Sequence, residues 1–336
     1  MVKSFRFLAG TGIMLFIIFF TPGCALLPPQ PLQVPVYNAA VFITANVPGS
    51  EIILDGVKQP YVTPDTVFTT EGSHRIDIVN EGYLTASYNV TAIADSVITL
   101  DAVLTASVQR VVLLEDFANT SCVPCVTSNL IIKSIRSYTY GANKLLAVKI
   151  PTNFPGSNDP LYLAAKTYCD SRMSYYNIIF APTTIIDGII KPVSSDSIKV
   201  KAAIEQRLAV PPKYKISITD SVYGGNIHYK VDLKCLDSTA ISNSELILRV
   251  KVIEEEITFA TPPGSNGETV FYDVLREKLP DPNGTILPKE TIYPGSNLQF
   301  NFTTSVKSAW HINQIRAIAF VQNRSTREVY QSATTD

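Results

Sequence analysis

Apolar and polar residues alternate with a period of two over two long stretches of the chain, which is typical of β-strands with one buried face. In the first stretch, residues 38–106, strands are expected at 42–43, 51–54, 74–79 and 88–90. In the second, residues 211–336, they are expected at 214–219, 228–236, 246–253, 297–303 and 315–322. Turn-forming residues separate these runs, and Asp55-Gly56 is a strong hairpin signal. Both stretches are therefore predicted to form β-sandwiches.

Residues 107–210 follow a different pattern. Continuous apolar runs at 111–114 and 145–150 indicate buried strands, and a further strand is expected at 183–186. Four apolar residues after Cys125 recur at helical spacing: Val126, Leu130, Ile131 and Ile135. Asp159-Pro160 is typical of a second helix start, and 195–208 is expected to form the last helix. The predicted fold class is thus a multidomain chain, α/β in the centre and all-β on both sides, the C-terminal sandwich being immunoglobulin-like.

The N-terminus is predicted to be a targeting segment. Lys3 and Arg6 precede an apolar run at 7–20, which is shorter than a membrane-spanning helix needs to be. Thr21-Pro22-Gly23-Cys24 then resembles a bacterial lipoprotein cleavage box. That resemblance implies a signal peptide at 1–24, an acylated Cys24 that anchors the chain to a membrane, and a Pro-rich tether at 25–37. The rival interpretation is an uncleaved N-terminal anchor helix.

The composition argues against several classes of function. The formal net charge is −1, and the chain beyond residue 24 has no cluster of Lys and Arg, so no nucleic-acid partner is expected. The three histidines have no second ligand at metal-site spacing, so no metal and no other cofactor is expected; they are His74, His228 and His311. Cys169 and Cys235 either bridge each other or are two separate buried side chains.

The segment Cys122-Val123-Pro124-Cys125 carries the candidate chemistry. It follows the apolar run at 111–114 and opens a helix, whose N-terminus lowers the pKa of the first thiol. Cys125 lies one turn on, close enough to resolve a mixed disulfide. A haem-attachment motif needs a histidine directly after the second cysteine, and Val126 stands there, which argues that the pair does not bind haem.

The cysteine segment resembles that of thioredoxin-like proteins, and this resemblance implies an acidic residue beneath the cysteine pair. Asp116 and Glu115 are both candidates, and strand alternation lets only one of them face the cysteines. The spacing to Cys122 favours Asp116. Buried there, its carboxyl would have a raised pKa and would take the proton of Cys125. The alternative interpretation is that both carboxylates lie at a solvent-exposed strand end and have no chemical role.

This arrangement resembles thioredoxin-like proteins, on Asp116, Phe117, Cys122, Pro124 and Cys125. The segment 180–188, with Ala181-Pro182-Thr183, resembles the cis-proline segment of that family. The resemblance implies a nucleophilic Cys122, a resolving Cys125 and a Pro182 that faces their disulfide. It further implies protein thiol or disulfide substrates that contact Ala181, Thr183, Val123 and Pro124. Ser121 departs from the aromatic residue usual in the family.

The first β region resembles the PEGA module; the matching segments are 47–50, 54–56, 63–64, 72–74 and 81–83. This implies a place in the cell envelope and contact with cell wall or carbohydrate. The order of the central and C-terminal regions is similar to Omp28-type outer-membrane lipoproteins, on segments 114–117, 181–183, 271–276, 317–323 and 326–331.

Two functions remain open on the sequence. The first is an envelope-anchored thiol–disulfide oxidoreductase that uses Cys122 and Cys125, at the outer membrane by family resemblance, on its periplasmic or surface side. The second is an outer-membrane or surface binding or scaffold lipoprotein in which the Cys122–Cys125 disulfide is structural. A C-x-x-C bridge closes too small a loop to constrain the unfolded chain much, which favours the first.

Overall fold

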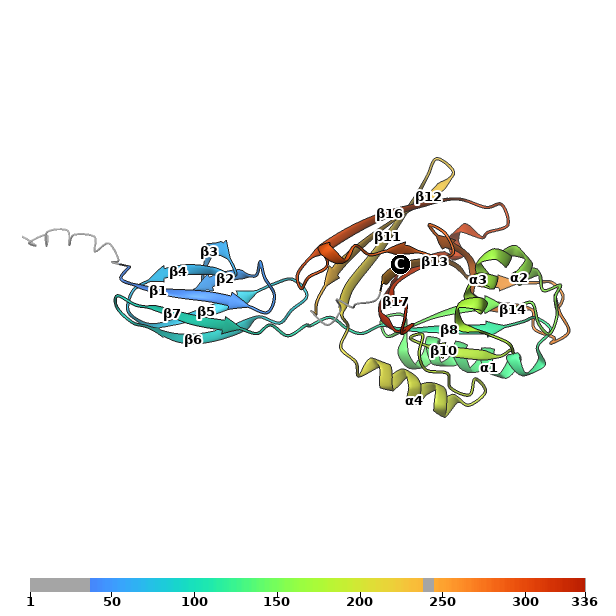
Figure 1. Ribbon diagram of the computed structural model, residues 1–336. Coiled ribbons are helices and arrows are strands. Elements are labelled where there is room, and N and C mark those ends of the chain that lie inside the picture. Colours follow the sequence, from blue (N-terminus) through green and yellow to red (C-terminus); the bar gives the residue numbers. More distant parts are fainter. Residues whose placement is uncertain (1–36, 238–244, 336) are drawn as a thin grey trace, which may run out of the picture. The chain divides into compact units, whose positions relative to one another are not determined.

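The computed structural model describes residues 37–237 and 245–335 (Figure 1). The expected signal peptide, Cys24 and all of the tether before Tyr37 lie outside the described residues. The described chain is mostly β-structure arranged in several sheets, with four α-helices in its central part.

Residues 39–102 form two small sheets. One has the order β4-β1-β7 and the other β3-β2-β5-β6. The strands are β1 (Ala39–Ala45), β2 (Glu51–Leu54), β3 (Val57–Val62), β4 (Asp65–Thr69), β5 (Gly72–Val79), β6 (Ala86–Ala92) and β7 (Val97–Ala102). Val41, Ile43, Ile52 and Ile76 meet in a shared core. Asp55 and Gly56 both have positive φ at the β2–β3 turn, as a tight hairpin requires.

The central elements begin with a strand that is buried along its whole length. In chain order they are β8 (Val112–Ala118), α1 (Val123–Ser134), the π-helix η1 (Ile135–Tyr140), β9 (Leu145–Pro151), α2 (Pro160–Ala164), α3 (Lys166–Tyr176), β10 (Thr183–Ile186) and α4 (Ser197–Leu208). The helix expected after Asp159 breaks at Ala165 into α2 and α3. The N-cap of α4 is Asp196, whose carboxylate accepts from two backbone N–H groups.

The central strands and part of the C-terminal region belong to one sheet. Its order is β10-β8-β9-β14-β13-β17-β18, with β15 paired to β13, and β14 runs parallel to β9. A second sheet, β11-β12-β16, covers the C-terminal half of it around a core that includes Leu248, Val250 and Ala319. The C-terminal strands are β11 (Tyr214–Tyr223), β12 (Asn226–Cys235), β13 (Leu246–Thr258), β14 (Val270–Leu279), β15 (Thr285–Ile286), β16 (Asn297–Ser305), β17 (Ile315–Asn323) and β18 (Val329–Thr334).

This sharing differs from the separate C-terminal sandwich expected at 211–336. The five strands expected there all form, but they divide between two sheets, one of which continues the sheet of the central region. The physical reason is the edge of β9, which would otherwise leave unpaired backbone groups beside a buried strand. β14 pairs with that edge at one position, where Val274 lies opposite Lys149.

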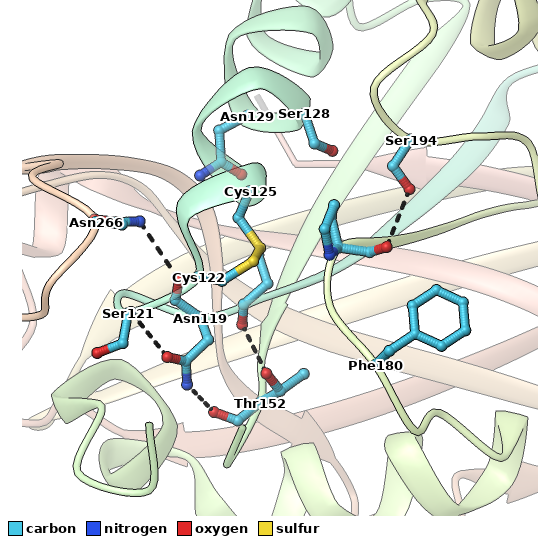
Figure 2. Close-up of a disulfide and its surroundings, with 12 residues drawn as sticks. Asn119, Ser121, Cys122, Cys125, Ser128, Asn129, Thr152, Phe180, Ser194 and Asn266 are labelled. Carbon is cyan, nitrogen blue, oxygen red and sulfur yellow. Dashed lines mark hydrogen bonds between the residues drawn. A yellow bond between two sulfur atoms is a disulfide. The ribbon is translucent and has the colours of Figure 1, made fainter. Parts of the chain in front are cut away.

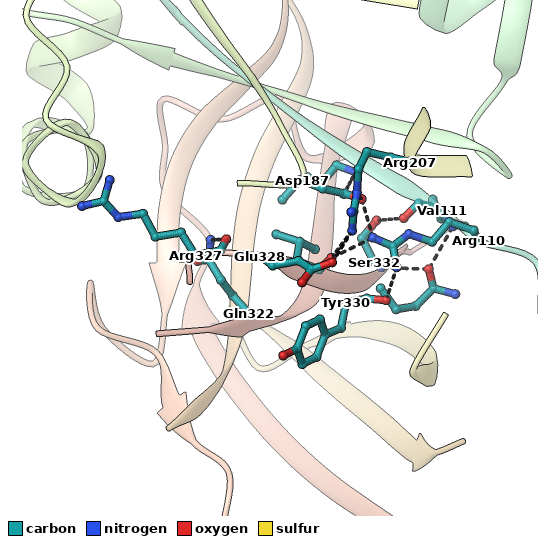
Figure 3. A network of polar contacts seen from close by, with 12 residues as sticks. Arg110, Val111, Asp187, Arg207, Gln322, Arg327, Glu328, Tyr330 and Ser332 are labelled. Atoms are coloured by element: carbon teal, nitrogen blue, oxygen red, sulfur yellow. Dashed lines mark hydrogen bonds and ion pairs between the residues drawn. The ribbon is translucent and has the colours of Figure 1, made fainter. Parts of the chain in front are cut away.

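The large sheet curls until β18 contacts β8, and buried polar residues close the seam (Figure 3). Asp187 lies at its centre, fully buried, and accepts from Arg110, from Arg207 Nε at 2.9 Å and from the backbone N–H of Leu113 at 2.9 Å. Its carbonyl accepts from the N–H of Val329 at 2.9 Å. Gly188 follows with a positive φ, and a Cβ there would lie 1.9 Å from the carbonyl oxygen of Arg327.

We expect Asp187→Asn to lower the free energy of unfolding by about 3–5 kcal/mol, because it removes the carboxylate that pairs with buried Arg110 and one of the two carboxylates that pair with Arg207. Urea unfolding followed by circular dichroism measures this difference. Asp220→Asn is the matched control, because Asp220 is an exposed residue of β11. Its stability should differ from that of the wild type by less than about 0.5 kcal/mol. Equal stability of Asp187→Asn and wild type would show that the seam does not depend on this charge.

Candidate functional site

Cys122 and Cys125 form a disulfide at the start of α1. Strand β8 ends at Ala118, and Cys122 is the N-cap residue of α1 with an extended backbone and no side-chain cap. Pro124 occupies the first turn, where its missing N–H costs nothing. The sequence thus places two sulfurs at a helix N-terminus, whose partial positive charge favours a thiolate when the bridge is reduced.

The loop before Cys122 is held by the side chain of Asn119 (Figure 2). Its amide nitrogen donates to the carbonyl oxygens of Thr152 at 2.6 Å and Gly156 at 2.9 Å. Its amide oxygen accepts from the N–H of Ser121 at 2.8 Å. These bonds fix the loop against the segment that follows β9, so the disulfide has a defined position.

The sulfurs are nearly covered, although the helix turn between them is not. Cys122 is 2% exposed and Cys125 is fully buried, whereas Val123 is 66% exposed. Ala118 and Ala181 pack against the cysteine pair.

The segment with Ala181, Pro182 and Thr183 lies beside the disulfide. The Ala181–Pro182 peptide bond is cis, and Thr183 pairs with Phe117 across β10 and β8. Just before it, Ile179 is 75% exposed and Phe180, which Figure 2 shows, is 63% exposed. These two side chains were not among the predicted site residues. The signal was present, because two bulky apolar residues directly precede the proline segment.

Asp116 is buried on the α1 side of the sheet and is not a solvated strand end. Its Oδ2 accepts from Lys149 Nζ at 2.8 Å, and Ser128 on α1 and Thr184 on β10 contact its Oδ1 at 3.5 and 3.4 Å. Asp116 and Lys149 are direct neighbours across the parallel pair β8 and β9. Ser128 lies one turn after Cys125, so Asp116 contacts the helix that carries the disulfide.

Glu115 points to the opposite face, into the interior of the curled sheet. It accepts from Arg172 at 2.6 Å and from Tyr176 at 2.7 Å, and it pairs with Lys251. Burial alone would raise the pKa of Glu115, but the charges of Arg172 and Lys251 hold it below its ordinary value. Burial lowers the pKa of Lys251 to about 7. Glu115 therefore belongs to a buried charge network and not to the disulfide site.

A cavity of about 310 Å³ lies between α1 and the segment 267–273. Its polar lining includes Asp116, Lys149, Asn129, Glu268 and Asp273, and its apolar lining comes from α1 and β14. Burial raises the pKa of Asp273 to about 7, although Arg136 Nη2 lies 3.0 Å from its Oδ1 and opposes the shift. The cavity therefore brings Asp116 together with other charged and polar side chains.

The β13–β14 loop contacts the loop before the cysteines. The N–H of Asn266 donates to the carbonyl oxygen of Thr120 at 3.1 Å, and Ser265 contacts Ser121 at 3.4 Å. At Gly264 a Cβ would lie 2.3 Å from the same Thr120 oxygen, so glycine permits the close approach. The sequence of this loop predicts only a turn-rich connection, so its contact with the site was not foreseen.

The other candidate residues have structural surroundings. Cys169 and Cys235 are free thiols, both buried, and do not bridge each other. His74 pairs with Asp55 and contacts Thr69 and Thr70. Within residues 37–237 and 245–335 no group of three or more His, Cys, Asp or Glu side chains is placed to hold a metal ion. In the same residues no helix has the length and apolar character needed to cross a membrane.

Comparison with known proteins gives one family match. The PEGA domain matches residues 39–107, so the expected resemblance of the first β region is confirmed. No curated protein matches the sequence.

Among solved structures, HBP35 of Porphyromonas gingivalis is similar over 68% of this chain and 76% of its own, with a TM-score of 0.58 and 13% identity. The two chains therefore share a fold over that length. A domain of the outer membrane lipoprotein Omp28 from Porphyromonas gingivalis covers 37% of this chain and 88% of its own, with 18% identity and a TM-score of 0.26. A score this low does not establish a shared fold.

We expect Asp273→Asn to flatten the pH dependence of stability between about pH 4 and 7. The raised pKa means that the folded state holds the Asp273 proton more tightly than the unfolded state, whose ordinary value is 3.8. The stability this proton contributes is therefore complete below about pH 4 and is lost as the pH rises through 7. Urea unfolding across pH 4–8 measures the slope, with Asp220→Asn as control. An unchanged slope in Asp273→Asn would contradict the assignment.

Proposed function

We propose that the chain is a cell-envelope protein that exchanges disulfides with other proteins through Cys122 and Cys125. The observation that carries this proposal is the placement of the disulfide at the N-terminus of α1, with Asp116 beneath that helix and the Ala181–Thr183 segment packed alongside. These are the elements that the resemblance to thioredoxin-like proteins implies. The parallel pair β8 and β9, with β10 antiparallel on the other side of β8, also agrees with it.

The exchange is reversible, and in its reducing direction it begins at Cys122. The Cys122 thiolate attacks a substrate disulfide, so that a Cys122–substrate disulfide forms and one substrate sulfur leaves as a thiolate. Cys125 then loses its proton to the Asp116 carboxylate and attacks Cys122 Sγ, and the second substrate thiolate leaves. Two electrons pass to the substrate, and the Cys122–Cys125 disulfide forms.

The exposed surface around the site suits an extended protein segment. Val123, Ile179 and Phe180 are large, apolar and more than half exposed. Together with Ala181 and the backbone of Thr183 they would contact the residues that flank a substrate cysteine. Apolar contact of this kind tolerates many sequences.

We expect Cys122→Ser to abolish the reduction of insulin by dithiothreitol that the wild type catalyses, because no other thiol of the pair can begin the exchange. Cys125→Ser should instead accumulate a mixed disulfide with the substrate, visible on a non-reducing gel. Cys169→Ala, which changes a thiol outside the site, is the control for general loss of thiols. Equal rates for Cys122→Ser and wild type would end the proposal.

A second candidate is a surface binding or scaffold protein whose Cys122–Cys125 bridge is structural. The 2% exposure of Cys122 and the β13–β14 loop packed against its neighbours favour this function. The PEGA match also agrees with it better than with exchange. In this function the PEGA region would contact cell wall or carbohydrate, and an acylated Cys24 would anchor the chain to a membrane, as it would in the first.

The reduction potential of the Cys122–Cys125 pair separates the two functions. We expect a value between about −120 and −270 mV, the range of proteins that exchange disulfides. Thiol trapping after equilibration in glutathione or dithiothreitol buffers measures it. A value below about −300 mV would instead indicate a structural bridge and favour the second candidate.

A further inference from the structure

A series of polar contacts runs from Asp116 in the central region to the β13–β14 loop of the C-terminal region. Lys149 Nζ donates to Asp116 and also to Oδ1 of Asn129, which lies on α1. The amide nitrogen of Asn129 lies 2.9 and 2.8 Å from the two carboxylate oxygens of Glu268. Because an ammonium donates only and a carboxylate accepts only, these neighbours fix the orientation of the Asn129 amide. Glu268 belongs to the β13–β14 loop, 139 residues further along the sequence.

The chain of contacts returns to the loop that precedes Cys122. Glu268 Oε2 accepts from Asn266 Nδ2 at 2.7 Å, and the N–H of Glu268 donates to Asn266 Oδ1 at 2.9 Å. The N–H of Asn266 in turn donates to Thr120. Glu268 thus contacts residues that lead both to the carboxylate beneath α1 and to the backbone two residues before the first cysteine.

The cavity places these groups in one shared environment. It is lined by Asp116 from β8, Lys149 from β9, Asn129 and Lys133 from α1, Glu268 from the loop and Asp273 from β14. Thr184 of β10 and Ser128 of α1 complete the surroundings of Asp116. A cavity of this size with several polar partners has room for water, which would carry a proton from Asp116 to solvent.

We propose that Glu268 is a positioning residue of the exchange site, which acts through Asn129 to hold Lys149 against Asp116. This inference rests on the proposed exchange function and deepens it. Glu268 touches neither sulfur. It would set how readily Asp116 takes the proton of Cys125, and so the pH at which the second step of the exchange becomes fast.

Two effects of removing the Glu268 charge oppose each other. Loss of a negative charge favours ionised Asp116 only slightly, because Asn129 separates the two carboxylates and the cavity between them has room for water that would screen the charge. Release of Asn129 loosens Lys149, which lies 2.8 Å from Asp116, and this disfavours ionised Asp116. The second effect is larger, because an opposite charge in direct contact shifts the pKa of a carboxyl group by about 1–3 units.

The test is the pH profile of glutathione-disulfide reduction by the pre-reduced, full-length protein between pH 4 and 9. We expect Lys149→Gln to move the acid limb upward by about one pH unit or more and Glu268→Gln by about half a unit. In the Lys149→Gln background, Glu268→Gln should have no further effect, because Glu268 acts through Lys149. Glu256→Gln, an exposed residue on β13, should leave the profile unchanged.

Each outcome decides a separate point. Exchange by the wild type with an unchanged profile in Glu268→Gln would overturn the positioning role alone. Equal shifts of Glu268→Gln in the wild-type and Lys149→Gln backgrounds would show a direct charge effect and overturn it too. A wild type without exchange at any pH would overturn the proposed function together with this inference. Thermal unfolding of each variant separates these results from loss of fold.

Discussion

The pairing of β9 with β14 is the contact on which the rest of this structure depends. It joins strands from the central and C-terminal regions in one sheet, so the two regions cannot be treated as independent bodies. The curl of that sheet brings β18 to β8, where Asp187 closes the seam with two guanidinium groups. The β13–β14 loop, which contacts the loop before Cys122, leads directly into the strand that makes this pairing.

The two acidic residues of β8 face opposite sides of the sheet and lie in different environments. Glu115 faces the interior of the curled sheet and is held by Arg172, Lys251 and Tyr176. Asp116, its neighbour, faces α1 and opens on a cavity. Both carboxylates are buried beside a cation, but only Asp116 also lines this cavity. Alternation along a strand therefore places two neighbouring carboxylates in different surroundings.

Much of the local structure could be predicted from the sequence, because the strand before Cys122, the helix after it and the Asp159 helix start follow from apolar spacing and capping residues. Lys149 could also have been found, since a single cation in the apolar run at 145–150 needs a buried partner. Period-two alternation identifies a strand but does not name its neighbour, so the pairing of β9 with β14 was not predicted. The contact of Asn129 with Glu268 depends on that pairing and on a loop without periodic structure.

The distance in sequence between the cysteines and the loop that packs against their neighbours has a consequence for biosynthesis. Asn129 and Glu268 are 139 residues apart. A ribosome that adds about 5–20 residues per second takes roughly 7–28 s to make the chain between them. During that interval Cys122 and Cys125 exist without the β13–β14 loop. A disulfide formed before this loop is in place would form in a more open setting than the complete fold offers, because the loop contacts Thr120 and Ser121 directly before Cys122.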